Sequence, residues 1–224
     1  MERNYKIEDL PITGQCRGEG LFILEDLEAI TSEELERAIA SLPEWRREKA
    51  LCFKFEQGRK ECAFAYLLLC QVLRDVYGIT QQPSFTIGEH GKPELAFNDN
   101  PNCQLSTVNC QLSSLHFNLS HCKPAIACVV ADHPVGVDIE RIGRYDESLA
   151  RHVLNDQEFS AVQQASDPQV AFIRYWTQKE AIVKLTGRGL DDDLKNLLFK
   201  YNNVSLHTKE HLDKGYVVTV AEWK

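Results

Sequence analysis

The chain has 224 residues, of which 43% are hydrophobic, and it carries a formal net charge of −8. This length allows one large domain or two small domains with a real apolar core. The acidic balance argues against a general nucleic-acid binder, which would carry a basic face. No apolar run approaches the roughly 20 residues that span a bilayer, and the polar start of the chain is unlike a secretion signal. These features predict a cytoplasmic protein with no membrane or nucleic-acid partner.

Eight cysteines raise the question of a metal site or disulfides. No two of them form a C-x-x-C pair, and several lie inside apolar runs, as Cys70 and Cys128 do. Small buried thiols in a reducing compartment explain this pattern better than zinc or a disulfide framework.

Apolar periodicity and turn-forming residues predict helices and short strands along the chain. Thr31 and Glu34 form a capping box that opens the first helix, and Gly78 is placed to end the second long one. Both halves offer helices followed by strands, which indicates an α+β architecture of two similar-sized lobes. In chain order, we expect a strand at 20–24, a helix from 31 to about 41, a helical turn at 43–49, a helix at 59–77, a strand at 85–87, a turn at 88–93, a polar loop at 98–111, strands at 115–119, 125–130 and 135–140, helices at 156–165 and 170–186, and a last strand at 216–220.

The predicted strand at 135–140 (VGVDIE) has two chemically different faces. Strict alternation places three aliphatic side chains on one face and Gly136, Asp138 and Glu140 on the other. The two carboxylates point the same way, with Cα atoms roughly 6.5 Å apart because a strand rises about 3.3 Å per residue. They repel each other unless a cation joins them, and Gly136 leaves room for something to approach the backbone. A half-solvated edge strand would show the same alternation.

Glu180 and Lys184 lie one turn apart on the flank of the predicted helix at 170–186. Helix energetics alone favour a Glu-before-Lys pair at this spacing, by about 0.2–0.5 kcal/mol. Glu180 could also join Asp138 and Glu140 in an oxygen-rich site for Mg²⁺, and Lys184 would then face the anion that the metal binds. The buried stripe of the same helix is expected to comprise Phe172, Tyr175, Trp176, Ile182 and Val183.

Other side chains could also meet an anion. Lys92 lies in a turn rich in Gly and Pro, and Ser120 and His121 follow a predicted strand. Taken singly, His121 is better explained as a structural histidine and Lys92 as an exposed turn residue. Upstream cations that could serve the same purpose are Arg46, Lys49, Arg59 and Lys60.

Four short motifs follow one another along the chain, namely Gly91–Pro93 (GKP), Phe117–His121 (FNLSH), Val135–Glu140 (VGVDIE) and Trp176–Lys184 (WTQKEAIVK), the last followed by GRGL. Their order resembles the 4′-phosphopantetheinyl transferases of the surfactin-synthetase-activating (Sfp-like) type. The resemblance implies transfer of the phosphopantetheine group of coenzyme A to a serine of an apo acyl or peptidyl carrier protein, with Mg²⁺ and release of 3′,5′-ADP. It also implies a monomeric single-chain pseudodimer with lobes at 1–134 and 135–224.

The resemblance further implies a role for each matching residue. Asp138, Glu140 and Glu180 would hold Mg²⁺ on the pyrophosphate, and Glu180 would deprotonate the serine directly or through a metal-bound water. Lys184 would stabilise or protonate the departing phosphate, and His121 would bond the phosphates. The residues expected to contact coenzyme A are Lys49, Lys60, His90, Gly91, Lys92, Pro93, Asn118, Ser120, His121, Asp138 and Lys184.

Two further functions stay open on the sequence. One is a Mg²⁺-dependent hydrolase of a nucleotide pyrophosphate, which would use the same residues with water as the nucleophile. The other is a catalytically silent coenzyme A-binding protein, against which the intact Asp138, Glu140, Glu180 and Lys184 argue. Nothing in the sequence distinguishes fatty-acid, polyketide and nonribosomal-peptide carriers.

Overall fold

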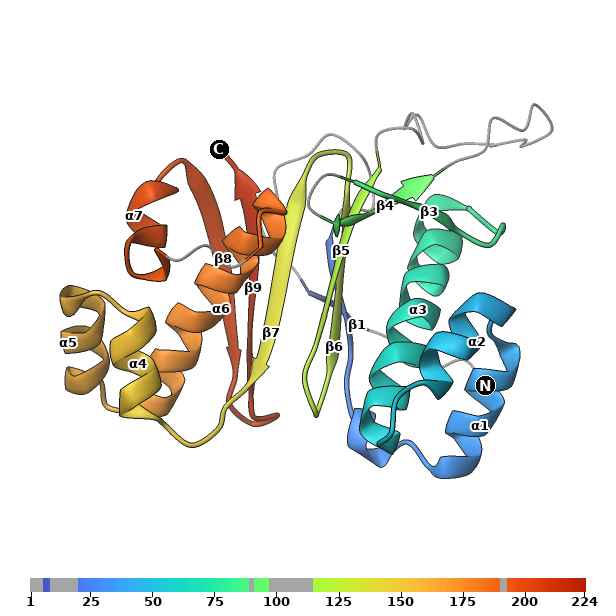
Figure 1. Cartoon of the computed structure of the whole chain (residues 1–224), viewed down its shortest axis with the longest axis horizontal. Coiled ribbons are helices and arrows are strands. Elements are labelled where there is room, and N and C mark those ends of the chain that lie inside the picture. Colours follow the sequence, from blue (N-terminus) through green and yellow to red (C-terminus); the bar gives the residue numbers. More distant parts are fainter. Residues whose placement is uncertain (1–5, 9–19, 89–90, 97–114, 190–192) are drawn as a thin grey trace.

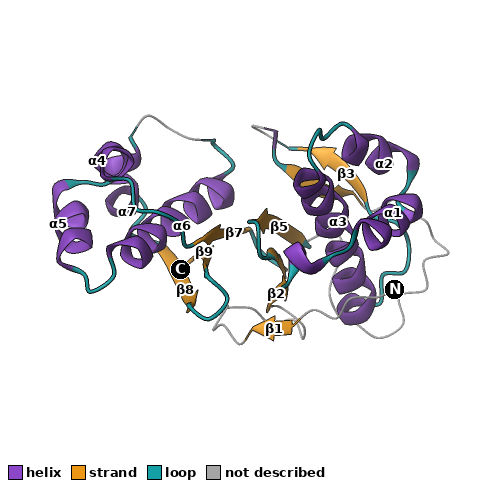
Figure 2. Cartoon of the chain, turned by 90° about the horizontal axis from the view of Figure 1, so that it is seen from below, coloured by secondary structure: helices purple, strands orange, loops and turns teal. Residues whose placement is uncertain are grey.

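The computed structural model describes residues 6–8, 20–88, 91–96, 115–189 and 193–224. Its two larger sheets pack against each other, and helices cover the outer side of each sheet (Figures 1 and 2). We call the elements β1 to β6 the N-terminal lobe and the elements β7 to β9 the C-terminal lobe. This arrangement confirms the predicted α+β class.

The N-terminal lobe contains a four-stranded antiparallel sheet of order β1-β2-β6-β5 and a separate hairpin of β3 and β4. Both halves of the predicted capping box are present at the start of α1, and Gly78 ends α3. The elements are β1 (Lys6–Glu8), β2 (Gly20–Leu24), η1 (Leu27–Ala29), α1 (Ser32–Ser41), α2 (Glu44–Leu51), α3 (Glu56–Tyr77), β3 (Ser84–Ile87), β4 (Pro93–Ala96), β5 (His116–His121) and β6 (Ile126–Ala131).

The C-terminal lobe contains a three-stranded antiparallel sheet of order β7-β9-β8, against which the long helix α6 packs. Asp167 caps this helix, and Pro168 stands at its first position, where no backbone donor is needed. The elements are β7 (Val135–Arg141), α4 (Glu147–Val153), α5 (Asp156–Gln164), α6 (Pro168–Thr186), η4 (Leu194–Asn196), α7 (Leu197–Lys200), β8 (Val204–His211) and β9 (Tyr216–Trp223).

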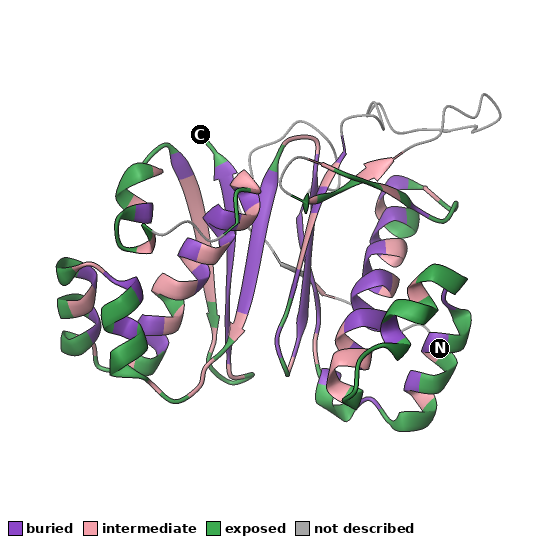
Figure 3. Ribbon diagram, viewed as in Figure 1, coloured by how far each residue is buried: buried purple, intermediate pink, exposed green. Residues whose placement is uncertain are grey.

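One apolar core joins the two lobes, because the inner faces of both sheets contribute to it. From the N-terminal lobe, Ile23 and Val129 are buried in this cluster, and from the C-terminal lobe Val137, Ile139 and Val218 are. Strands β6 and β7, which lie where the two lobes meet, are accordingly buried along most of their length (Figure 3). The aliphatic face predicted for residues 135–139 therefore lies at the junction of the lobes, and the face with the carboxylates turns toward α6.

Gly136 marks the point where β7 and α6 come closest. A Cβ atom at this position would collide with the carbonyl oxygen of Ala181 and lie 2.5 Å from the backbone nitrogen of Leu185. Because Gly136 has no side chain, the backbone of α6 can approach β7 closely at this position. This contact joins β7, which carries Asp138, to α6, which carries Lys184.

We expect Gly136→Ala to lower the free energy of unfolding by about 1–3 kcal/mol or more, because the obstructing atoms are backbone atoms that cannot rotate away. Urea denaturation would measure the change. The matched control is Gly143→Ala, whose Cβ would meet only the Arg141 oxygen at 3.9 Å, and we expect that variant to stay within about 0.5 kcal/mol of the wild type. Equal stability of the two variants would contradict the close approach.

Several sequence expectations need correction. The helix predicted at 59–77 begins three residues earlier, at Glu56, and the turn predicted at 88–93 leads directly into a strand, β4. Helix α4 and strand β8 were not expected: α4 is short, and β8 (VSLHTKEH) is too polar and only partly buried to show an apolar alternation. Within α6, Tyr175 and Trp176 are half-buried, whereas Thr177 and Lys179 are completely buried.

Two further observations concern composition. In the described part of the chain, no helix combines the length and apolar content that crossing a bilayer requires. The described cysteines are free thiols; Cys62, Cys122 and Cys128 are buried as expected, whereas Cys52 is exposed.

Candidate active site

Asp138 lies at the centre of the candidate site, where it is 3% exposed. Lys184 of α6 donates hydrogen bonds from Nζ to Asp138 Oδ1 and to Ser120 Oγ, both at 2.7 Å. Ser120 of β5 donates to the same Asp138 oxygen at 2.9 Å. Residues from β5, β7 and α6 therefore meet at one carboxylate oxygen.

Side chains of β5 also hold the two sheets together beside Asp138. Strand β7 is an edge strand of its described sheet, so some of its N–H groups point away from β9. Asn118 Oδ1 accepts a hydrogen bond from the N–H of Val137 at 2.9 Å, and Ser120 Oγ accepts one from the N–H of Ile139 at 3.2 Å. Because a buried N–H group without a partner is costly, these bonds fix β5 against β7. Contact of Asn118 and Ser120 with coenzyme A stays a prediction.

Burial and the negative charge of Asp138 raise the pKa values of both Glu140 and Glu180. Burial raises the pKa of Glu140 to about 7; Asp138 and Glu180 add to this rise, and the hydrogen bond from Trp176 and the charge of Lys184 oppose it. Burial, followed by Asp138, also raises the pKa of Glu180, while Lys184 lowers it. Crowded carboxylates of this kind are stabilised in their charged form by a bound cation.

The donor set fits Mg²⁺, which takes oxygen ligands from a few carboxylates, water and phosphates. Oδ2 of Asp138 is buried and has no hydrogen-bond partner in the described structure, so it can accept a bond from a cation. Among the described residues, however, no three His, Cys, Asp or Glu side chains already surround a common metal position. Glu140 instead accepts a hydrogen bond from Nε1 of Trp176 at 3.3 Å. Ligation by Asp138, Glu140 and Glu180 together would therefore require side-chain rotation, and it stays a prediction.

Three basic residues that were expected to bind the phosphates of coenzyme A either have acidic partners other than Asp138 or are exposed. Lys60 is buried, and its ammonium pairs with Glu56 at 2.8 Å. His121 is exposed at the end of β5, with Nδ1 at 3.4 Å from a carboxylate oxygen of Glu61. Lys49 is exposed in the last turn of α2. In the described part of the chain, no hydrogen bond or ion pair joins these three residues to Asp138, and their contacts with phosphates stay predictions.

The predicted turn before Pro93 connects β3 to β4. Gly91 has φ 83°, in the left-handed region that glycine adopts at little cost. Lys92 is not a freely exposed turn residue, because its Nζ donates hydrogen bonds to the carbonyl oxygens of Val135 and Leu185, each at 3.3 Å. His90 and the polar loop at 98–111 lie outside the described residues.

Trp176 is a site residue that the sequence analysis assigned only to the buried stripe of its helix. It is half-buried, and its indole N–H contacts Glu140. The signal was present, because Trp176, Glu180 and Lys184 follow one another at intervals of four residues and so share one face of α6.

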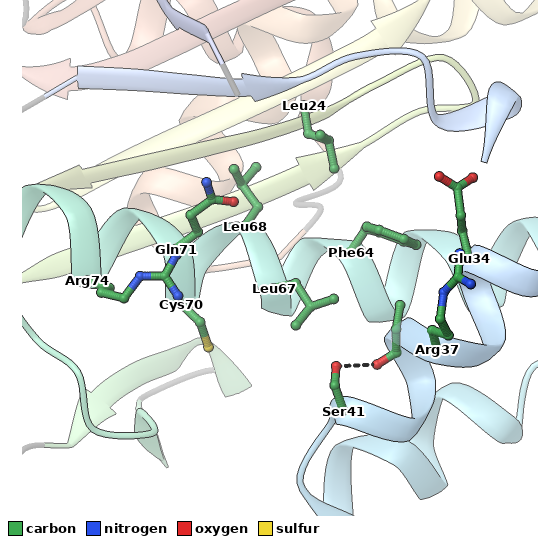
Figure 4. A pocket seen from close by; sticks show the side chains of 11 residues that line it. Leu24, Glu34, Arg37, Ser41, Phe64, Leu67, Leu68, Cys70, Gln71 and Arg74 are labelled. Atoms are coloured by element: carbon green, nitrogen blue, oxygen red, sulfur yellow. Dashed lines mark hydrogen bonds between the residues drawn. The ribbon is translucent and has the colours of Figure 1, made fainter. Parts of the chain in front are cut away.

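A pocket elsewhere in the N-terminal lobe is lined mainly by α1 and α3 (Figure 4). Phe64, Leu67 and Leu68 line it with apolar surface, and Arg37 and Arg74 lie at opposite ends of the group. Its described lining includes none of the predicted site residues, so it is separate from the site around Asp138.

Residues 134–221 match the family model described as the 4′-phosphopantetheinyl transferase superfamily, a segment that contains Asp138, Glu140, Glu180 and Lys184. The chain is also 33% identical over 108 residues to the 4′-phosphopantetheinyl transferase gsp of Aneurinibacillus migulanus, an alignment that covers 47% of this chain and 39% of the relative. It is 26% identical over 164 residues to a 4′-phosphopantetheinyl transferase of Bacillus subtilis, covering 72% of this chain and 67% of the relative.

A third relative is the 4′-phosphopantetheinyl transferase psf-1 of Bacillus pumilus, which is 29% identical over 154 residues, covering 67% of this chain and 60% of the relative. The aligned parts of gsp and psf-1 are thus less than two thirds of those proteins. The family match falls on the C-terminal lobe, and the alignments to the second and third relatives span more than half of the chain. Taken with the carboxylates and lysine gathered between β7 and α6, these similarities make the 4′-phosphopantetheinyl transferase superfamily the family that this chain resembles.

Proposed function

We propose that this protein transfers the 4′-phosphopantetheine group of coenzyme A to a serine hydroxyl of an apo acyl or peptidyl carrier protein. The observation that carries the proposal is the buried Asp138, which has one oxygen bonded to Lys184 and Ser120 and the other without a hydrogen-bond partner. Glu140 and Glu180 lie beside it on the same face of β7 and on α6. The arrangement combines acceptors for a divalent cation with a lysine that can face a phosphate.

In the proposed reaction, the serine oxygen attacks the β-phosphorus of the coenzyme A pyrophosphate. A new bond forms between this oxygen and the phosphorus, the bond from the phosphorus to the bridging oxygen breaks, and 3′,5′-ADP leaves. Glu180 takes the serine proton, and burial together with the charge of Asp138 raises the pKa of this carboxyl. Lys184 stabilises the charge that develops on the departing phosphate, or protonates it.

Asp138, Glu140 and Glu180 are the residues that would hold Mg²⁺. When bound, the ion would neutralise charge on the pyrophosphate and polarise the phosphorus. Ser120 and Lys184 hold Asp138 in place, and Asn118 secures the neighbouring stretch of β7. Phosphoryl transfer chiefly requires positioning and charge stabilisation, which these residues supply.

We also propose the finer points of organisation. The lobes divide at 134/135, where the turn after β6 ends and β7 begins, and a single chain supplies the whole site from β5, β7 and α6. We place the protein in the cytoplasm, since buried free thiols such as Cys122 and Cys128 suit a reducing compartment. Coenzyme A would reach the site from the side of Gly91–Pro93.

Intact-mass spectrometry tests the proposed function. After incubation with coenzyme A, Mg²⁺ and an apo carrier protein, we expect the carrier to gain about 340 Da, the mass of one phosphopantetheine group. A carrier whose serine is replaced by alanine is the control and should gain nothing. Release of 3′,5′-ADP without any carrier would indicate a pyrophosphate hydrolase instead. Binding of coenzyme A with no product from any carrier class would indicate a silent binding protein.

A further inference from the structure

Lys92 is the charged residue of the GKP motif, and backbone atoms of the C-terminal lobe hold its ammonium group. Its Nζ lies 3.3 Å from the carbonyl oxygen of Val135 on β7 and 3.3 Å from that of Leu185 on α6. Building on the proposed transfer reaction, we infer that Lys92 is a positioning residue whose ammonium clamps the β3–β4 turn to the two elements that carry Asp138 and Lys184.

The contact with Leu185 provides a hydrogen-bond donor for a carbonyl group at the C-terminal end of α6. Helix α6 ends at Thr186, so Leu185 belongs to the last turn, whose carbonyl groups have no amide partner further along the helix. Within this turn, the amide of Gly187 bonds to Val183, and the Thr186 hydroxyl bonds to Ile182 and Val183. Lys92 provides the donor for Leu185 from another lobe, and a cation is favourable at this negative end of the helix. Lys184, the catalytic candidate, is the neighbouring residue.

The contact with Val135 fixes the start of β7 at the same place. Val135 is the first residue of the strand, and the next residue, Gly136, is the point where β7 touches the backbone of Leu185. The three segments that meet at Lys92 are therefore the β3–β4 turn, the start of β7 and the end of α6. Asp138 lies three residues along the strand from Val135, so a shift at this junction would reach it directly.

The charged groups around Lys92 agree with a structural contact. Burial lowers the pKa of Lys92, and Glu94 on β4 opposes this change. His116 on β5 is close enough for the charge of Lys92 to lower its pKa, after the larger effect of burial. The ammonium is thus partly removed from water, and it donates hydrogen bonds to two backbone carbonyls.

A second connection between the lobes lies at the opposite end of β7 and offers a matched control. Strand β7 pairs Val135 with Glu222 at one end and Arg141 with Tyr216 at the other. At that far end, the Tyr216 hydroxyl donates a hydrogen bond to Glu25 of the N-terminal lobe at 2.6 Å. Tyr216→Phe removes a contact between the lobes without touching the turn, the end of α6 or the candidate site.

The experiment compares Lys92→Met, Lys92→Arg and Tyr216→Phe in the full chain. For Lys92→Met, which keeps the aliphatic stem, we expect kcat for carrier modification to fall roughly 10- to 100-fold because the reacting groups lose their alignment. The dissociation constant for coenzyme A, measured by calorimetry, should change by less than about twofold. Amide hydrogen exchange over 183–187 should become about tenfold faster, as expected for loss of a hydrogen bond to a charged donor.

Lys92→Arg, which retains a cationic donor, should recover part of the kcat and of the amide protection. Tyr216→Phe should lower the melting temperature while kcat stays within about twofold of the wild type. Weaker coenzyme A binding with unchanged kcat and unchanged exchange in Lys92→Met would make Lys92 a nucleotide ligand and overturn the clamp. Should the wild type modify no carrier, the proposed function fails by itself, and the exchange rates over 183–187 still decide whether the clamp exists.

Discussion

Glu180→Gln is expected to lower kcat for carrier modification by roughly 10²- to 10⁴-fold, the range associated with loss of a general base. The substitution keeps the shape of the side chain but removes the oxygen that can take a proton from the attacking serine. Burial and the charge of Asp138 both raise the pKa of Glu180, so the wild-type carboxyl binds a proton more readily than an exposed one. Quenched reactions that follow carrier mass against time would measure the change.

Coenzyme A binding separates this role from a general loss of the site. We expect calorimetry to show a dissociation constant for Glu180→Gln within about tenfold of the wild type, since the proton acceptor acts after binding. The control is Glu33→Gln on α1, where the carboxylate is exposed and pairs with Arg37 at 2.8 Å; it should leave kcat unchanged. A Glu180→Gln enzyme with wild-type turnover would remove Glu180 from the chemistry.

Lys179→Met is expected to cause the largest loss of stability, about 3–5 kcal/mol of unfolding free energy, because it leaves a buried charge without its partner. Lys179 is completely buried on α6. Its ammonium pairs with Glu158 of α5 at 2.8 Å and donates hydrogen bonds to the carbonyl oxygens of Leu194 at 2.7 Å and Lys195 at 3.4 Å. Urea denaturation followed by circular dichroism would measure the change.

Two comparison variants make the cause of this loss testable. In the double variant Lys179→Met with Glu158→Leu, no buried carboxylate is left unpaired, so we expect part of the stability to return. Arg37→Met breaks an exposed pair with Glu33 and should cost at most about 1 kcal/mol. If Lys179→Met were as mild as Arg37→Met, the buried pair would not hold α5 to α6.

Local patterns were sufficient to place most of the elements that carry the site. The alternation in Val135–Glu140 correctly separated an apolar face from a face with Asp138 and Glu140, because side chains of a strand point to opposite sides whatever the fold. The capping residue Thr31 correctly marked a helix start, since a cap acts on amides only a few residues away. The four motifs in order predicted the family.

The sequence by itself therefore determined the α+β class, the secondary structure around the site and the residues that could form it. Only the tertiary structure decided which of them meet: Lys184 bonds to Asp138 and Ser120, Lys92 reaches across to Leu185, and Lys179 is buried against Glu158. The physical reason is the distance along the chain over which each kind of interaction acts. Periodicity and capping report interactions within one or two turns, whereas the partner of a lysine depends on how separate elements pack, and that packing leaves no mark in the order of neighbouring residues.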